Sequence, residues 1–234
     1  MWCRERFKSG ADAEAGSALV AVLLGAAFLS ALAASAILLS TSDTLGAARQ
    51  RDARVALYAA EAALEQAAAE LVRAADWNAV LSGAAVSPRA GGLPSDSRIP
   101  FADGEMTAAQ VANLATCAMT TACTAEASAA VTDDRPWGAN NPWWRPYFFG
   151  AVDEATPAQA ATYVVVLVGD DPSENDGDPS RDGVAPGNPG ADVLLLRAEA
   201  FGPGATRRAV EAVVARVGAA GAALPRVISW RAVR

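Results

Sequence analysis

The sequence contains no histidine and a single lysine, Lys8. A catalytic histidine base is therefore absent and a P-loop lysine is nearly excluded, which argues against an ordinary enzyme. Aromatic residues make up only 6% of the sequence, and 26 acidic residues against 19 basic ones give a net charge of −7 at pH 7. Because nucleic-acid binding requires a basic surface, we expect neither an enzyme nor a nucleic-acid-binding protein.

Charge is also missing from residues 17–42, an apolar run within a chain of 234 residues that is long enough for one or two domains. A run of this length can span a bilayer as a helix, which satisfies its own backbone hydrogen bonds there. Basic side chains occur within residues 1–16, and the first charge after the run is Asp43. The positive-inside rule therefore predicts that residues 1–16 are cytoplasmic and that the remainder lies across the membrane.

Three interpretations of the run compete: a removable secretory signal, a permanent anchor, and the leader and stem of a pilin. A signal peptidase site is available at residues 34–36 (ASA), and cleavage there would leave Ile37 first. Asp12 and Glu14, just before the run, argue against a signal peptide, because that region is normally basic.

The residues after the run predict a second, amphipathic half of the same helix, assigned to residues 43–81. Strong helix formers dominate residues 44–75, and no proline occurs before Pro88. Leu57, Leu64 and Leu71 recur every seven residues and form an apolar stripe, while charged residues occupy the other faces.

A charged leader ending at Gly16, the apolar run, and the segment RDARVALYAAEAALEQAAAEL (residues 51–71) together resemble PilX-type minor pilins of type IV pilus systems. AAEAAL, at residues 59–64, is the most specific part of the resemblance. RAEAFGPGATRRAVEAVVARV and RVISWRAVR, in the C-terminal region, resemble the closing strands of the same family.

This resemblance implies that prepilin peptidase cleaves after Gly16 and that Ser17 becomes the N-methylated first residue. The helix would hold the subunit in the bacterial inner membrane with the head in the periplasm, and would later pack into a pilus at the cell surface. The implied partners are other minor pilins, the major pilin, the inner-membrane assembly platform and a tip adhesin.

One position departs from the major-pilin pattern, which has a glutamate five residues after the cut, where this chain has Ala21. In major pilins that glutamate is thought to pair with the N-terminal amine of a neighbouring subunit. Its absence fits a subunit that primes or caps the filament tip, and it also fits a plain anchor. Two further alternatives stay open: a pseudopilin of a type II secretion system, and a secreted or anchored calcium-dependent binding module.

Residues 82–234 predict a globular head with long loops and a small antiparallel sheet. The β-branched run at 163–168 predicts a buried strand, and segments 193–201 and 206–217 predict a hairpin around a Gly-Pro-Gly turn. Residues 226–233 predict a fourth strand. Packing of the leucine stripe on this sheet would give an α+β, pilin-like fold.

Cys117 and Cys123 frame a short loop, CAMTTAC, in this head. If Cys3 is lost with the leader, two cysteines remain in an oxidising compartment, which favours a disulfide. Two buried thiols and a metal pair are the alternatives, although a zinc site would need ligands that the sequence lacks.

Six of the 15 aromatic residues fall within residues 135–150, RPWGANNPWWRPYFFG. One hypothesis is that these rings fill the gap between the stem helix and the sheet. The other is that they contact a partner, since tryptophan and tyrosine are enriched in binding hot spots. The candidate contact residues are Trp137, Trp143, Trp144 and Tyr147. Three prolines predict an irregular, rigid loop throughout the segment.

Acidic residues are concentrated in residues 169–192, GDDPSENDGDPSRDGVAPGNPGAD. Carboxylates on a glycine-rich loop suit Ca²⁺, which takes six to eight oxygen ligands, although the complete EF-hand spacing is absent. The candidate ligands are Asp171, Asn175, Asp176, Asp178 and Asp182. The alternative is a solvated acidic loop with no cofactor, and a glycosidase carboxylate pair is disfavoured because all these acids share one loop.

Overall fold

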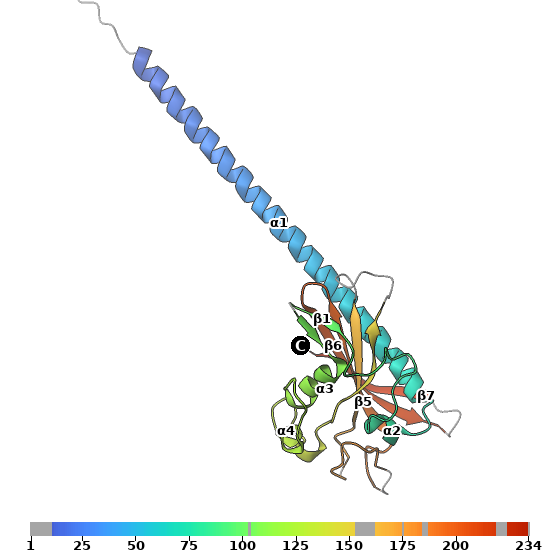
Figure 1. The fold of residues 1–234 in the computed structure, drawn as a ribbon. Helices are drawn as coiled ribbons and strands as arrows, with labels where there is room; N and C mark the ends of the chain where they lie inside the picture. Colours follow the sequence, from blue (N-terminus) through green and yellow to red (C-terminus); the bar gives the residue numbers. More distant parts are fainter. Residues whose placement is uncertain are drawn as a thin grey trace, which may run out of the picture. The chain divides into compact units, whose positions relative to one another are not determined.

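The computed structural model describes residues 11–102, 104–152, 162–174, 176–183, 187–218 and 224–233, with side chains from residue 17 onward. Figure 1 shows the helices and strands in order. The chain divides into two compact units, residues 1–48 and residues 49–234, and helix α1 (Ala11–Leu71) contributes to both.

In the first unit, every described side chain of α1 is exposed, including large apolar ones such as Leu24, Phe28 and Leu38. The segment Ser17–Leu71 is long and apolar enough to cross a membrane, judged by its length and composition. Hydroxyl groups in this part of α1 donate to the backbone of the preceding turn: Ser30 Oγ lies 2.8 Å from the carbonyl oxygen of Ala26. The polar side chains thus find partners within the helix.

The second unit is built on a five-stranded antiparallel sheet in the order β3-β4-β5-β6-β7. Its strands are β3 (Arg145–Ala151), β4 (Tyr163–Asp170), β5 (Val193–Gly202), β6 (Thr206–Val217) and β7 (Leu224–Val233). The predicted hairpin is confirmed, because Gly202 pairs with Thr206 across the β5–β6 turn. The β-branched run forms β4, and the predicted C-terminal strand forms β7.

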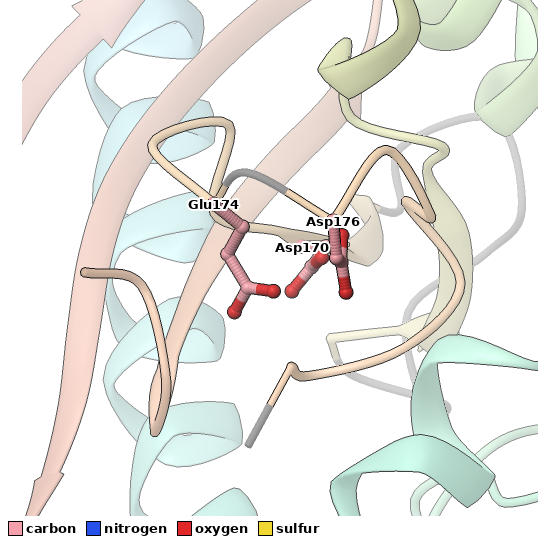
Figure 2. A group of neighbouring side chains, drawn as sticks. All are labelled: Asp170, Glu174 and Asp176. Atoms are coloured by element: carbon pink, nitrogen blue, oxygen red, sulfur yellow. The ribbon is translucent and has the colours of Figure 1, made fainter. Parts of the chain in front are cut away.

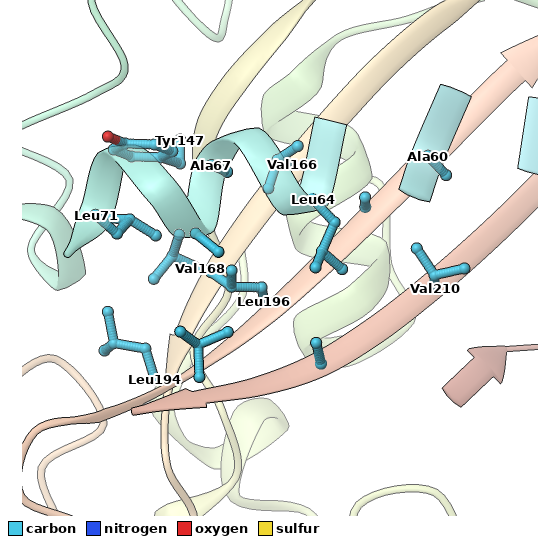
Figure 3. Packing of buried hydrophobic residues seen from close by; sticks show 14 of the residues in the cluster. Ala60, Leu64, Ala67, Leu71, Tyr147, Val166, Val168, Leu194, Leu196 and Val210 are labelled. Atoms are coloured by element: carbon cyan, nitrogen blue, oxygen red, sulfur yellow. The ribbon is translucent and has the colours of Figure 1, made fainter. Parts of the chain in front are cut away.

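The buried face of α1 packs on one side of this sheet (Figure 3). Leu64 and Leu71 are at most 2% exposed and belong to the same cluster as Val168 and Leu196, while Leu57 is partly buried against it. Burial of this stripe confirms the predicted α+β architecture, a long helix on an antiparallel sheet.

The stem helix is shorter than predicted, because α1 ends at Leu71 rather than continuing to residue 81. A separate short helix, α2 (Trp77–Leu81), follows the break. Its N-cap is Asp76, whose side chain accepts a hydrogen bond from the backbone N–H of Asn78. A capping aspartate favours a new helix start over continuation of the old helix.

The opposite face of the sheet is covered by α3 (Ala108–Cys117) and by the small hairpin of β1 (Ile99–Phe101) and β2 (Gly104–Met106). Thr107 and Gln110 form a capping box at the start of α3. Two short helices, α4 (Ala125–Ala129) and η1 (Gly138–Asn140), lead into the sheet. Both faces of the central strands are therefore buried.

One prediction about the aromatic segment is wrong, because its second half is not a loop but strand β3. Pro146 lies inside that strand, paired with Leu167, and the register shifts between Pro146 and Phe148. Proline is tolerated here because β3 is an edge strand and carries a bulge, so the missing N–H does not interrupt a central hydrogen-bond ladder.

An ion-pair network crosses β5, β6 and β7. Arg197 lies between the carboxylates of Glu199 and Glu211, with nitrogen–oxygen distances of 2.6 Å to each. Arg207 and Arg231 extend the network at its two ends, pairing with Glu199 and Glu211 respectively. The network pairs both buried glutamates of these strands.

Candidate functional site

The most distinctive polar site of the described chain lies in the connection between β4 and β5. Asp170 is the last residue of β4 and pairs with Leu194 on β5, so the sheet fixes where the connection leaves and returns. Hydrogen bonds from elsewhere anchor its middle: the backbone N–H of Asp182 donates to Asn78 Oδ1 on α2 at 2.8 Å, and Asn140 donates to the carbonyl oxygen of Glu174.

Three carboxylates of this connection converge (Figure 2). One oxygen each from Asp170, Glu174 and Asp176 lie within 4.8 Å of one another. Asp170 and Glu174 are both 3% exposed, whereas Asp176 is exposed. We call these three residues the acidic cluster. Its all-oxygen, convergent geometry could hold a metal ion.

Glu174 is held by groups on the return half of the loop. Its Oε2 accepts hydrogen bonds from the backbone N–H of Gly183 and from Asn188 Nδ2, both at 2.9 Å. A Cβ atom at Gly183 would lie 2.5 Å from this same oxygen, so only glycine permits the close approach of the backbone. The loop is therefore folded around the Glu174 carboxylate.

The electrostatic consequence is a shift of the carboxyl pKa values toward the neutral form. Burial, followed by the charge of Glu174, raises the pKa of Asp170 to about 9. Burial also raises the pKa of Glu174, although hydrogen bonds from Asn188 and Gly183 act against it. The pKa of Asp182 is raised, mainly by burial. For all three residues, burial is the largest cause, and it penalises the negatively charged form.

The structure brings together a different set of acids from the one predicted. Of the predicted ligands, only Asp176 belongs to the acidic cluster, and Asn175 lies outside the described residues. Asp171 and Asp178 instead accept hydrogen bonds from Ser173 and Ser180 within local turns. Asp182 is buried and accepts from the backbone N–H of Asp192 at 2.8 Å.

Sequence reasoning missed Asp170 and Glu174 as members of the site. A usable signal existed for Asp170, because it comes two residues after the β-branched run at 163–168 and so marks the end of a buried strand. Glu174 carried no comparable signal, since its burial depends on Asn140, Gly183 and Asn188, which are distant in the sequence.

The four candidate contact residues of the aromatic segment divide between core and surface. Trp144 and Tyr147 are buried, in the clusters on opposite faces of the sheet. Trp137 is 42% exposed, and Trp143 is half-buried with the guanidinium of Arg145 5.4 Å from its ring centroid. Trp143 and Arg145 also line a cavity of about 330 Å³. Core packing therefore accounts for Trp144 and Tyr147.

The predicted disulfide is present between Cys117, the last residue of α3, and Cys123. It closes the loop that follows the helix, where Ala118 adopts a left-handed conformation. The predicted cleavage position, between Gly16 and Ser17, falls within α1, and Ser17 is exposed.

No protein-family model matches this sequence, and neither a curated protein nor a solved structure matches it.

Proposed function

We propose that this chain is a minor pilin of a type IV pilus system, anchored in the bacterial inner membrane by α1 and processed by prepilin peptidase between Gly16 and Ser17. Its role is structural and associative: it primes or caps a filament whose helices pack against α1. The partners are other minor pilins, the major pilin, the assembly platform and a tip adhesin. A type II secretion pseudopilin is the alternative that uses the same stem.

The observation that carries this proposal is the division of α1 into two halves with different surroundings. Residues 17–48 expose their apolar side chains, whereas residues 56–71 bury a stripe on the sheet of the second unit. An exposed apolar surface of this extent requires cover by lipid or by other apolar helices. In a pilin subunit, lipid covers this surface before assembly, and the helices of neighbouring subunits cover it in the filament.

Two local features of the apolar half support burial in such surroundings. The hydroxyls of Ser30, Ser35 and Thr41 donate to carbonyl oxygens one turn earlier, so they enter a nonpolar environment already hydrogen-bonded. A Cβ atom added at Gly25 would have nothing within 4 Å, and Gly25 lies beside the small residues Ala21, one turn earlier, and Ala26. Small residues permit close approach between helices in a lipid-like medium.

The test is N-terminal sequencing of the protein isolated from membranes of cells with and without prepilin peptidase. We expect Ser17 as the first residue only where the peptidase is present. Gly16→Leu should block this cleavage, whereas the matched control Gly25→Leu, further along the helix, should leave it unchanged.

Two other outcomes would contradict the proposal. Ile37 as the first residue in both strains would identify a secretory signal, and the chain would then be a secreted binding module, for which the acidic cluster is the supporting observation. Retention of Met1 in both strains would identify a permanent anchor.

A further inference from the structure

Two oxygens of the acidic cluster are buried without a hydrogen-bond partner. Among the residues that the structure describes, nothing donates to Asp170 Oδ1 or to Glu174 Oε1. Both residues are only 3% exposed, and both carboxylates are turned into the space that they share with Asp176 (Figure 2). A buried polar atom without a partner costs free energy, so these two oxygens require a ligand that completes them.

No cation of the protein supplies that ligand within the described part of the chain. The ion pairs found there join arginines to Glu105, Asp192, Glu199 and Glu211, and none includes a member of the acidic cluster. Three carboxylates that converge without a counter-charge repel one another. A bound divalent cation would remove both the repulsion and the unpartnered oxygens.

We propose that Asp170, Glu174 and Asp176 bind one Ca²⁺ ion, which ties the end of β4 to the loop that follows it. Glu174 contributes Oε1, because its Oε2 already accepts from Gly183 and Asn188. Asp170 contributes the unpartnered Oδ1. Asp176 is the solvent-exposed ligand of the three. This site is independent of how the N-terminus of the chain is processed.

The donor set selects the ion. Carboxylate oxygens alone favour hard cations, whereas zinc favours histidine and thiolate ligands; the sequence has no histidine, and Cys117 and Cys123 are joined in a disulfide. Mg²⁺ demands strict octahedral geometry and gives up its water reluctantly. A largely buried site on an irregular, glycine-containing loop is better suited to Ca²⁺, which accepts flexible geometry and loses water more readily.

The test uses the full chain in detergent, stripped with EGTA and titrated with calcium chloride by isothermal titration calorimetry and by thermal unfolding. We expect one Ca²⁺ per chain and a Tm that rises with calcium concentration, because an ion that binds only the folded chain stabilises it. Asp170→Asn and Glu174→Gln should weaken binding by about tenfold or more, since each removes a charged ligand.

Asp178→Asn is the matched control, because it also removes one carboxylate from the loop but leaves the acidic cluster intact. It should bind calcium as the unmodified chain does, since an asparagine side chain can still accept from Ser180. In the absence of calcium, Asp170→Asn should melt no lower than the unmodified chain, because asparagine has nearly the same size and its neutral amide is not repelled by Glu174. A fall in its calcium-free Tm would show that Asp170 has a structural role other than ion binding.

A second measurement does not depend on any variant. The Trp144 ring lies against Gly169, the residue before Asp170, so terbium bound in the site should emit on tryptophan excitation, and calcium should displace it. Absence of calcium-dependent heat, of a Tm shift and of displaceable terbium emission would overturn the proposal. A response to Mg²⁺ that equals or exceeds the response to Ca²⁺ would overturn the choice of ion.

Discussion

The carboxylate of Glu199 is completely buried in the sheet, and its Oε1 accepts a hydrogen bond from Nε of Arg197, two residues earlier on β5, at 2.6 Å. The same guanidinium also pairs with Glu211 on β6. Arg197 therefore neutralises two buried carboxylates at once, and both charges raise the pKa of Arg197 although burial alone would lower it. Arg197 is therefore the central member of the network.

Arg197→Met should reduce the free energy of unfolding by about 3–5 kcal/mol, because it leaves Glu199 and Glu211 paired only with the more exposed Arg207 and Arg231. Arg231→Met is the matched control: the Arg231 side chain is 68% exposed, and its loss should cost about 1 kcal/mol or less. Chemical denaturation of the full chain in detergent measures both. Equal losses for the two variants would contradict the interpretation of Arg197 as the central member.

Tyr147 should make the stability of the head fall in alkaline solution. Burial, together with the nearby charge of Glu70, raises the pKa of this hydroxyl from 10.0 to about 12. The raised pKa means that the folded state favours the neutral hydroxyl. The contribution of Tyr147 to the free energy of unfolding is therefore fully present below about pH 10 and is lost as the pH rises through about 12. The free energy of unfolding of the wild type should therefore fall more steeply across this window than that of Tyr147→Phe. Parallel curves for the two proteins would show that Tyr147 ionises as freely in the folded state as in the unfolded one.

Trp144 and Trp137 should respond differently to truncation. Trp144 is 6% exposed and packs in the cluster beneath α3, so Trp144→Ala should cost about 3–5 kcal/mol. Trp137 is 42% exposed, and Trp137→Ala should change the stability by about 0.5 kcal/mol or less. Thermal unfolding distinguishes them, and a large loss for Trp137→Ala would contradict its assignment as a surface residue.

The disulfide should contribute a moderate part of the stability, because it closes a short loop. Cys117 and Cys123 are separated by six positions, and chain-entropy arguments give about 2 kcal/mol for a loop of this size. The double variant Cys117→Ser/Cys123→Ser should lose this amount in chemical denaturation. Mass analysis without reductant should find neither thiol free, and two reactive thiols would contradict the assignment.

Most of the fold could be predicted because its signals are local. The run at 163–168 and the Gly-Pro-Gly turn determine β4 and the β5–β6 hairpin through residue preferences alone. Strand β3 could not be predicted in the same way: Pro146 argues against a strand unless one knows that the strand lies at a sheet edge. Edge position is a property of the whole sheet and is not visible in the segment.

The sequence predicted the loop that carries the acidic cluster and one of its three members, Asp176, but not Asp170 or Glu174. Acidic composition indicates that carboxylates gather in residues 169–192, yet which of them are buried depends on contacts with distant residues. Asn140 holds the backbone of Glu174, and Asn78 holds that of Asp182. These contacts exist only once η1 and α2 are in place, so periodicity and composition could not separate Glu174 from Asp178.

Alanines supply much of the α1 face that lies on the sheet: Ala56, Ala60, Ala67 and Ala68 are all at most 3% exposed. An alanine side chain has no rotamers to lose, whereas each buried leucine gives up about 0.5–1 kcal/mol of conformational entropy. At these four positions the helix therefore docks with no loss of side-chain rotamer entropy. Ala60 is completely buried, so a larger residue there would push the helix away from the strands.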